Sequence, residues 1–307
     1  MPTVRPKDPV ALLCSDLHLS DKPPVARAEE EDWYGCMEAV LKFITKTYDK
    51  YEVPVIFAGD LFHKAKSPPK LEILAMHWMQ AWQLQAIPGQ HDLPAHRLEA
   101  VEESSYGVVL RGLGILSTLS PECPRANSDI KITGFPFGSP LSANTRKKDL
   151  LQVAVIHQLI WKGEPPFPGA PESGNVKNVV KELKGFDVIV AGDNHQGFVT
   201  QVGDTTVVNC GSVMRRAADQ VDYQPHIYIL HRDGSVKAIP VPIDKDKLGL
   251  KHLEIKKDRD ERVENFVKSL RDDAEIELSF EKNLDQYFNL NKVGKEVQQT
   301  ILAAMED

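Results

Sequence analysis

The chain has 307 residues, of which 42% are hydrophobic and 26% are charged, a composition typical of a folded globular protein. Acidic residues outnumber basic ones by 44 to 37, which gives a formal net charge of −7 and excludes a protein that holds nucleic acid by bulk positive charge alone. No apolar run approaches the roughly 18 residues that cross a bilayer, so we expect no membrane association and a cytoplasmic location. The four cysteines are scattered and form no C-x-x-C pair, which favours reduced thiols over a disulfide framework.

Short apolar runs alternate with amphipathic segments along the first 240 residues. We expect buried strands at residues 10–14, 53–57, 84–87, 131–135, 153–156, 187–190, 205–208, 227–230 and 236–240. Helices are predicted at residues 29–48 and 69–82. Strands flanked by helices predict a layered α/β fold. Because the second helix is apolar nearly all round, it is predicted either to be buried or to form a dimer interface.

The composition changes after about residue 244. Strands are predicted at 251–256 and 274–280, and helices at 260–271 and 293–305. We therefore predict two domains, a main domain over residues 1–244 and a small α+β domain over residues 245–307.

Acids, amides and imidazoles recur directly after the predicted strands. They are Asp16 and His18, then Asp60 and His63, then Gln90, His91 and Asp92, then His157, and finally Asp193 and His195. In open α/β sheets, ligands bind beyond the carboxyl ends of the strands. The five clusters are therefore predicted to meet in one crevice.

These residue types suit a pair of divalent cations. Carboxylate and amide oxygens are hard donors, and neutral imidazole is a borderline donor. A carboxylate such as that of Asp60 can bridge two ions about 3.5–4 Å apart. The glycines before Asp60, Gln90 and Asp193 allow the backbone to come close to such a charged site. Each motif alone is common, so the prediction rests on the ordered set.

The ordered motifs D-x-H, G-D-x-x-H, G-Q-H-D, a lone H and G-D-N-H resemble those of the calcineurin-like metallophosphoesterase superfamily, over residues 10 to 230. The segments 132–136 and 210–212 are similar to its DNA-repair exonuclease branch, which includes SbcD-type nuclease subunits. The resemblance implies a layered metallophosphoesterase β-sandwich flanked by helices, followed by a small C-terminal capping domain. It further implies two divalent metal ions, with Mn²⁺ preferred and Mg²⁺ as the alternative. DNA as the substrate, a homodimer and an SbcC-type ATPase partner are also implied.

The resemblance also implies a role for each motif residue. Asp16, His18 and His195 would bind the first metal, Asp60 would bridge, and Gln90, His157 and Asp193 would bind the second. His91 would protonate the leaving oxygen, oriented by Asp92, and His63 would contact the phosphate. The chain departs from the family pattern twice, with Gln90 in place of Asn and Asp193 in place of His. Both departures concern ligands of the second metal, so the sequence does not decide whether that site is fully occupied or how fast the enzyme turns over.

Substrate contacts are expected from basic residues near the motifs. The candidates are Lys64, Lys66, Arg215 and Arg216, and the alternative is that they are solvated surface charges. The leading interpretation is a dimetal phosphodiesterase that hydrolyses DNA. A small-molecule phosphodiesterase or phosphatase on the same fold, and a catalytically weakened scaffold, remain as alternatives.

Overall fold

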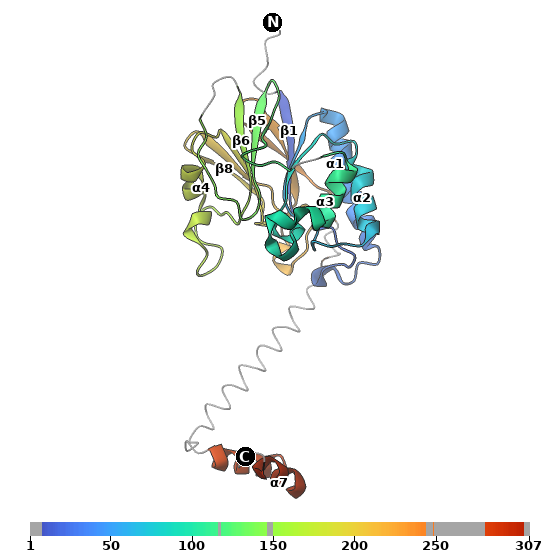
Figure 1. Cartoon of the computed structure of the whole chain (residues 1–307), viewed down its shortest axis with the longest axis vertical. Coiled ribbons are helices and arrows are strands. Elements are labelled where there is room, and N and C mark those ends of the chain that lie inside the picture. The colour runs from blue at the N-terminus through green and yellow to red at the C-terminus, as the bar shows by residue number, and fades with distance from the viewer. Residues whose placement is uncertain (1–7, 116–117, 146–149, 244–247, 249–279, 304–307) are drawn as a thin grey trace. The chain divides into compact units, whose positions relative to one another are not determined.

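The computed structural model describes residues 8–115, 118–145, 150–243, 248 and 280–303 (Figure 1). The chain divides into two compact units, Met1–Gly249 and Leu250–Asp307. In the second unit the described residues form helices α6 (Phe280–Leu290) and α7 (Lys295–Ala303). The helix predicted at 293–305 matches α7, and α6 was not predicted. The elements predicted at 251–256, 260–271 and 274–280 lie outside the described residues, except for residue 280. The small α+β domain therefore stays a prediction.

Two β-sheets form the centre of the first unit. Their strand orders are β11-β10-β1-β2-β3 and β4-β5-β6-β7-β9-β8. The strands are β1 (Pro9–Cys14), β2 (Val55–Ala58), β3 (Leu84–Ile87), β4 (Arg125–Ala126), β5 (Ile130–Phe135), β6 (Leu151–His157), β7 (Val188–Gly192), β8 (Phe198–Val202), β9 (Thr205–Asn209), β10 (His226–His231) and β11 (Val236–Pro240). All nine predicted strands are present, and β4 and β8 were missed.

The parallel strands fix where the motifs lie. Strands β1, β2 and β3 run parallel in the first sheet, and β5, β6, β7 and β9 run parallel in the second. The carboxyl ends within each set therefore reach the same edge of the sheet. A bridge between Ser15 and Ser212 links the segments that follow β1 and β9 at that edge.

Helices cover the outer faces of the sheets. The α-helices of this unit are α1 (Trp33–Tyr51), α2 (Pro69–Met79), α3 (Ser105–Gly112) and α4 (Val176–Glu182). Short 3₁₀ turns are η1 (Val25–Arg27), η2 (Gln90–Asp92), η3 (Pro94–His96), η4 (Leu98–Glu103), η5 (Glu172–Gly174) and η6 (Ala218–Gln220). Helix α1 begins later than predicted because Asp32 caps it, accepting a hydrogen bond from the Gly35 amide at 2.8 Å.

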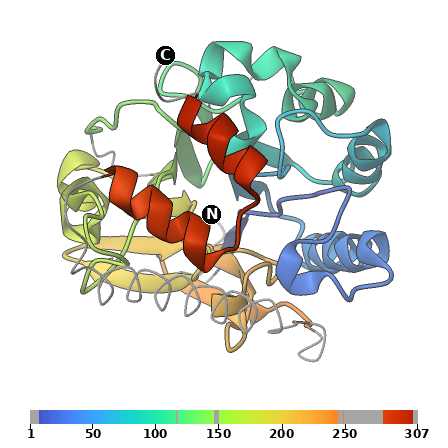
Figure 2. The same ribbon diagram turned by 90° about the horizontal axis from the view of Figure 1, so that it is seen from below.

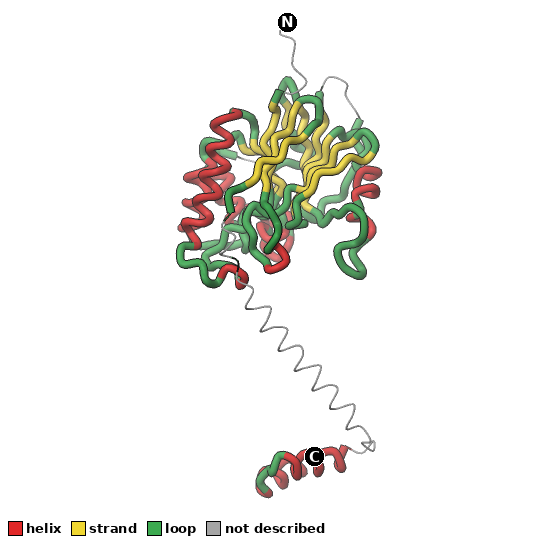
Figure 3. The backbone as a smooth tube through the Cα atoms, turned by 180° about the vertical axis from the view of Figure 1, so that it is seen from behind, coloured by secondary structure: helices red, strands yellow, loops and turns green. Residues whose placement is uncertain are grey.

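Three apolar clusters hold the layers together. One packs the first sheet against α1–α3, a second fills the space between the sheets, and a third packs the second sheet against α4. Seen from below, α1–α3 and α4 lie on opposite sides of the paired sheets (Figure 2), and the view from behind shows the strands between the outer helices (Figure 3). The predicted layered sandwich flanked by helices is confirmed. Strands buried on both faces explain why their sequences are continuously apolar.

Helix α2 is less completely buried than its sequence suggested. Leu71, Ala75 and Met79 are buried in the core, whereas 61% of Ile73 is exposed. One face of the helix therefore packs against the sheet and the other carries an apolar side chain at the surface. No helix among the described residues is long and apolar enough to cross a membrane.

Candidate metal centre

The five motifs meet where the two sheets place their parallel strand ends. Three groups of possible ligands form there among the described residues: Asp16 with His18 and His195, Asp16 with Asp60 and His157, and His18 with His63 and His91. The ligand atoms within each group lie within 4.8 Å of one another. Asp16, Asp60 and His157 are almost completely buried. The convergence expected from the strand ends is therefore present in the structure.

The first group presents two facing imidazoles. Nε2 of His18 lies 3.0 Å from Nε2 of His195 and 3.7 Å from Oδ1 of Asp16. Burial, followed by the neighbouring His195, lowers the pKa of His18 well below its ordinary value. A neutral imidazole is the form that binds a metal ion. Burial raises the pKa of Asp16 to about 7, and a cation bound beside this carboxyl would favour its charged form.

The second group is built around His157. Its Nδ1 lies 2.6 Å from the carbonyl oxygen of Ala58, so Nδ1 carries a hydrogen and Nε2 is left for a ligand. That Nε2 lies 3.4 Å from Oδ2 of Asp60. Neither atom has a hydrogen-bond partner among the described residues, although both are buried. Buried polar atoms are normally satisfied, so this pair marks a position that suits a cation.

The charges around His157 reinforce this assignment. Burial alone would lower the pKa of His157, but the carboxylates of Asp60 and Asp16 outweigh burial and raise it to about 10. Burial would likewise raise the pKa of Asp60, but the imidazole of His157 outweighs it and the pKa of Asp60 is lowered. The environment of Asp60 and His157 therefore favours positive charge at this position.

The two departures from the family pattern contact each other. Nε2 of Gln90 donates to Oδ1 of Asp193 at 2.7 Å, while Oε1 of Gln90 is buried without a hydrogen-bond partner. The amide of Asp193 donates to Oδ1 of Asp16 at 3.2 Å. Among the described residues, neither cluster around Asp16 includes Asp193. The Gln90 oxygen is thus a candidate ligand, and the Asp193 side chain positions it.

Three residues of the site have a left-handed backbone conformation, which residues other than glycine seldom adopt. Asp16, His18 and Asp60 have φ values of 51°, 46° and 59°. Asp and His tolerate this region better than most residues, and such strain concentrates at functional sites. A side chain at Gly89 would place its Cβ 2.2 Å from Oδ1 of Asp60 and 2.6 Å from Nε2 of His157. The close approach expected at this glycine is present.

His91 and His63 lie over the same edge as the ligands. Their rings stack with centroids 5.1 Å apart, and each also contacts the ring of His18 edge-on. Nδ1 of His91 lies 2.9 Å from the carbonyl oxygen of His63, and the His91 amide donates to Oδ1 of Asp60 at 2.9 Å. Burial and Arg216 lower the pKa of His63 to about 4, so this ring is neutral at pH 7.

Asp92 does not orient His91, and that part of the prediction is wrong. Its carboxylate accepts hydrogen bonds from the amides of Leu61 (3.2 Å), Phe62 (2.9 Å) and Gly89 (3.0 Å). Nδ1 of His91 contacts the carbonyl oxygen of His63 instead of Asp92. Burial, followed by the charge of Asp60, raises the pKa of Asp92 to about 7, against the effect of the three amides. Asp92 therefore joins the turns that follow β2 and β3.

The basic candidates divide into two pairs. Lys64 and Lys66 are exposed beside His63. Arg215 is only 1% exposed and donates to the carbonyl of Val221 at 2.8 Å, so its predicted role in substrate binding is wrong.

Arg216 is 8% exposed and donates to the carbonyl of His18 at 2.8 Å. Arg216 thus contacts the backbone of a candidate ligand residue, and its role in substrate binding stays a prediction. The stretch 146–148, also basic, lies outside the described residues.

Two further groups act at the site and were not predicted. The hydroxyl of Ser15 donates to Oδ2 of Asp16, and the carbonyl of Ala58 fixes the ring of His157. Ser15 directly precedes a motif residue, which was the available signal. A backbone carbonyl leaves no side-chain signature, so the part played by Ala58 could come only from the structure.

The donors gathered here fit a pair of divalent cations. Carboxylate, imidazole and amide oxygen are all present, and five buried atoms of these side chains, including Nε2 of His157, Oδ2 of Asp60 and Oε1 of Gln90, lack a hydrogen-bond partner among the described residues. Together with the layered fold, they define a metallophosphoesterase. Residues 11–233 match the calcineurin-like phosphoesterase superfamily domain, and the chain belongs to that superfamily.

Among curated proteins, the chain is similar to the DNA double-strand break repair protein Mre11 of Halobacterium salinarum. The two are 26% identical over 211 residues, which is 67% of this chain and 52% of the relative. The chain thus spans about half the length of that relative. The likeness agrees with the DNA-repair branch expected from the motifs.

Solved structures with related folds are more distant. An archaeal phosphodiesterase is 13% identical with a TM-score of 0.42, covering 75% of this chain and 98% of its own. A putative 5′-nucleotidase from Staphylococcus aureus is also 13% identical with a TM-score of 0.44, covering 80% and 57%. Similarities this low carry no argument about function.

Proposed function

We propose that this chain is a dimetal-dependent phosphodiesterase that hydrolyses DNA in repair or recombination, as an SbcD-type nuclease subunit. The observation that carries the proposal is the facing pair of unsatisfied, buried donors, Nε2 of His157 and Oδ2 of Asp60, beside the cluster of Asp16, His18 and His195. The similarity to Mre11 supports DNA as the substrate class.

The ligand assignment follows the two clusters. Asp16, His18 and His195 would hold one ion, and Asp60, His157 and Oε1 of Gln90 the other. Two Mn²⁺ or Mg²⁺ ions bound there would supply Lewis acidity toward a phosphodiester and a nucleophile at neutral pH. The oxygen-rich second site favours these hard cations over zinc.

His91 is proposed to protonate the leaving sugar oxygen. Its amide is fixed by Asp60, and its Nδ1 contacts the carbonyl of His63. A ring protonated on both nitrogens would keep that contact and donate its Nε2 proton to the departing oxygen. His63, stacked on His91, is proposed to contact the phosphate.

Lys64 and Lys66 are proposed to contact the DNA backbone. Both are exposed immediately after His63, close to where a phosphate would bind. Binding through such residues weakens as salt rises. Because the net charge of the chain is −7, attraction of a polyanion such as DNA has to come from local positive charges such as these lysines.

The proposal is tested by cleavage of end-labelled DNA with Mn²⁺, with a small chromogenic phosphodiester assayed in parallel. We expect DNA cleavage that EDTA abolishes. Hydrolysis of the small diester without DNA cleavage would favour the alternative enzyme, a small-molecule phosphodiesterase. Loss of both activities in protein shown to bind metal would favour the scaffold.

Two protein partners are also proposed. Two copies are proposed to meet through α2, where Ile73 is 61% exposed, and an SbcC-type ATPase is proposed from the resemblance. Sedimentation of the protein at micromolar concentration tests the dimer, which Ile73→Asp should dissociate.

A further inference from the structure

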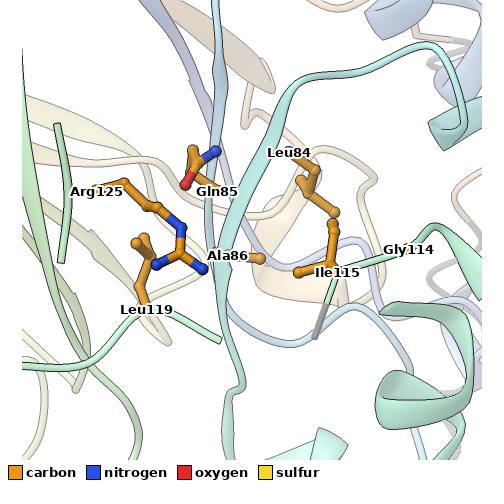
Figure 4. Close-up of a pocket in the computed structure, with 7 residues that line it drawn as sticks. All are labelled: Leu84, Gln85, Ala86, Gly114, Ile115, Leu119 and Arg125. Carbon is orange, nitrogen blue, oxygen red and sulfur yellow. The ribbon is translucent and has the colours of Figure 1, made fainter. Parts of the chain in front are cut away.

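A cavity of about 370 Å³ adjoins the metal centre. His157 and Asp193 line it, and its other walls come from residues 135–141 at the end of β5 and 156–159 at the end of β6. A separate cavity of about 330 Å³ at the edge of β3 shares no residue with the centre (Figure 4). The first cavity therefore shares two residues with the proposed reaction site.

Phe137 is held rigidly in the wall of this cavity. It lies in a tight turn closed by the Ser139 amide, which donates to the carbonyl of Pro136 at 2.9 Å, and Gly138 takes the left-handed conformation at φ +79°. The Phe137 amide donates to the carbonyl of Pro88 at 3.3 Å, and its half-buried ring lies 6.1 Å from the ring of His96. The aromatic ring is thus tied to the loop that carries Gln90 and His91.

The lining suits a flat, uncharged group. Phe135, Phe137, Leu141 and Leu159 supply apolar walls, while Gln158 offers both donors and an acceptor. Among the described residues no Lys or Arg lines the cavity, which favours a base over a phosphate there. Ligand pockets span about 300–1,000 Å³, and this one lies at the small end. A single base fits that description better than a base pair does.

We propose that this cavity receives one unpaired base adjoining the cleaved phosphate, with Phe137 as a specificity-determining residue that stacks on it. The inference rests on the proposed DNA phosphodiesterase function. Stacking of a base on an aromatic ring tolerates any base, so the preference is for an unpaired nucleotide rather than a sequence. The substrate class becomes DNA with single-stranded or frayed ends.

The test compares single-stranded oligonucleotides that carry either a normal base or an abasic tetrahydrofuran residue at the cleaved position, with Mn²⁺. We expect wild-type kcat/KM to be about tenfold higher for the normal base, as one stacking contact provides. Phe137→Ala should remove this difference, and Phe137→Trp should preserve it. Phe43→Ala is the matched control, because Phe43 is a half-buried ring on α1 that does not line this cavity.

A second measurement is independent of turnover. In EDTA, an oligonucleotide with 2-aminopurine at the terminal position should lose fluorescence on binding wild type, because stacking quenches it, and should keep it with Phe137→Ala. Equal cleavage of normal and abasic DNA by wild type, with no quenching, would overturn the base pocket and leave the proposed function standing. No cleavage of any DNA would overturn the proposed function and the base pocket together.

Discussion

Nδ1 of His157, at the end of β6, lies 2.6 Å from the carbonyl oxygen of Ala58, at the end of β2, so one hydrogen bond joins the two sheets at the metal centre. It fixes the tautomer of the imidazole and aims Nε2 at Asp60. The ligand geometry is therefore set by the packing of the sheets before any ion binds.

Metal affinity should rise with pH. The pKa of His157 is raised to about 10, so between pH 7.5 and 9 a cation that binds Nε2 must displace a proton from the imidazole. Apparent affinity should increase about tenfold per pH unit in this range. Below pH 7 the slope should steepen, because the pKa of Asp16 is raised to about 7.

Titration calorimetry with Mn²⁺ in two buffers of different ionisation enthalpy measures the protons released. About one proton per protein is expected near pH 8. An affinity that is flat from pH 7.5 to 9 would show that His157 holds no proton in this range, which would contradict its raised pKa.

Gly89→Ala should weaken metal binding by at least about tenfold, the effect of disturbing groups around a ligand. The added Cβ would lie 2.2 Å from Oδ1 of Asp60, which must then shift. Gly294→Ala is the control, since among the described residues no atom beyond its chain neighbours lies within 4 Å of its added Cβ. Equal affinities of the two variants, measured by Mn²⁺ titration, would contradict this packing.

His91→Asn should lower turnover on DNA by about 10²–10⁴-fold, the range for loss of a general acid, while Mn²⁺ affinity stays within about threefold. Asparagine keeps the backbone amide that bonds to Asp60. Near-normal kcat in this variant would exclude His91 as the proton donor.

Asp92→Ala should destabilise the fold rather than change the chemistry directly. It leaves the buried amides of Leu61, Phe62 and Gly89 without their acceptor, at a cost of at least about 2 kcal/mol in the free energy of unfolding. Urea denaturation in EDTA measures the loss, and Asp92→Asn, which retains one acceptor oxygen, should lose less. If both variants match wild type, Asp92 does not join the turns.

The strands and the position of the metal centre could be predicted from the sequence, because both depend on the pattern of apolar and polar side chains. Apolar runs such as residues 153–156 marked the strands, and polar motifs at their ends marked the centre, because parallel strands bring their carboxyl ends together. Short helices such as α3 and α4 were missed, since eight and seven residues give too little periodicity to detect.

The errors at the site have a different cause. Arg215 and Arg216 were predicted to contact the substrate, with solvated surface charges as the alternative, yet both are buried and their guanidinium groups donate to backbone carbonyls. Asp92 was assigned to its sequence neighbour His91, whereas it bonds to amides thirty residues away. Backbone partners are not encoded by residue type, so only the folded chain reveals them.

Anomalous diffraction from crystals grown with Mn²⁺ would locate the bound cations directly. We expect two peaks, one within bonding distance of Asp16, His18 and His195, and one within bonding distance of Asp60 and Nε2 of His157. A single peak, or none touching His157, would contradict the two-cation centre.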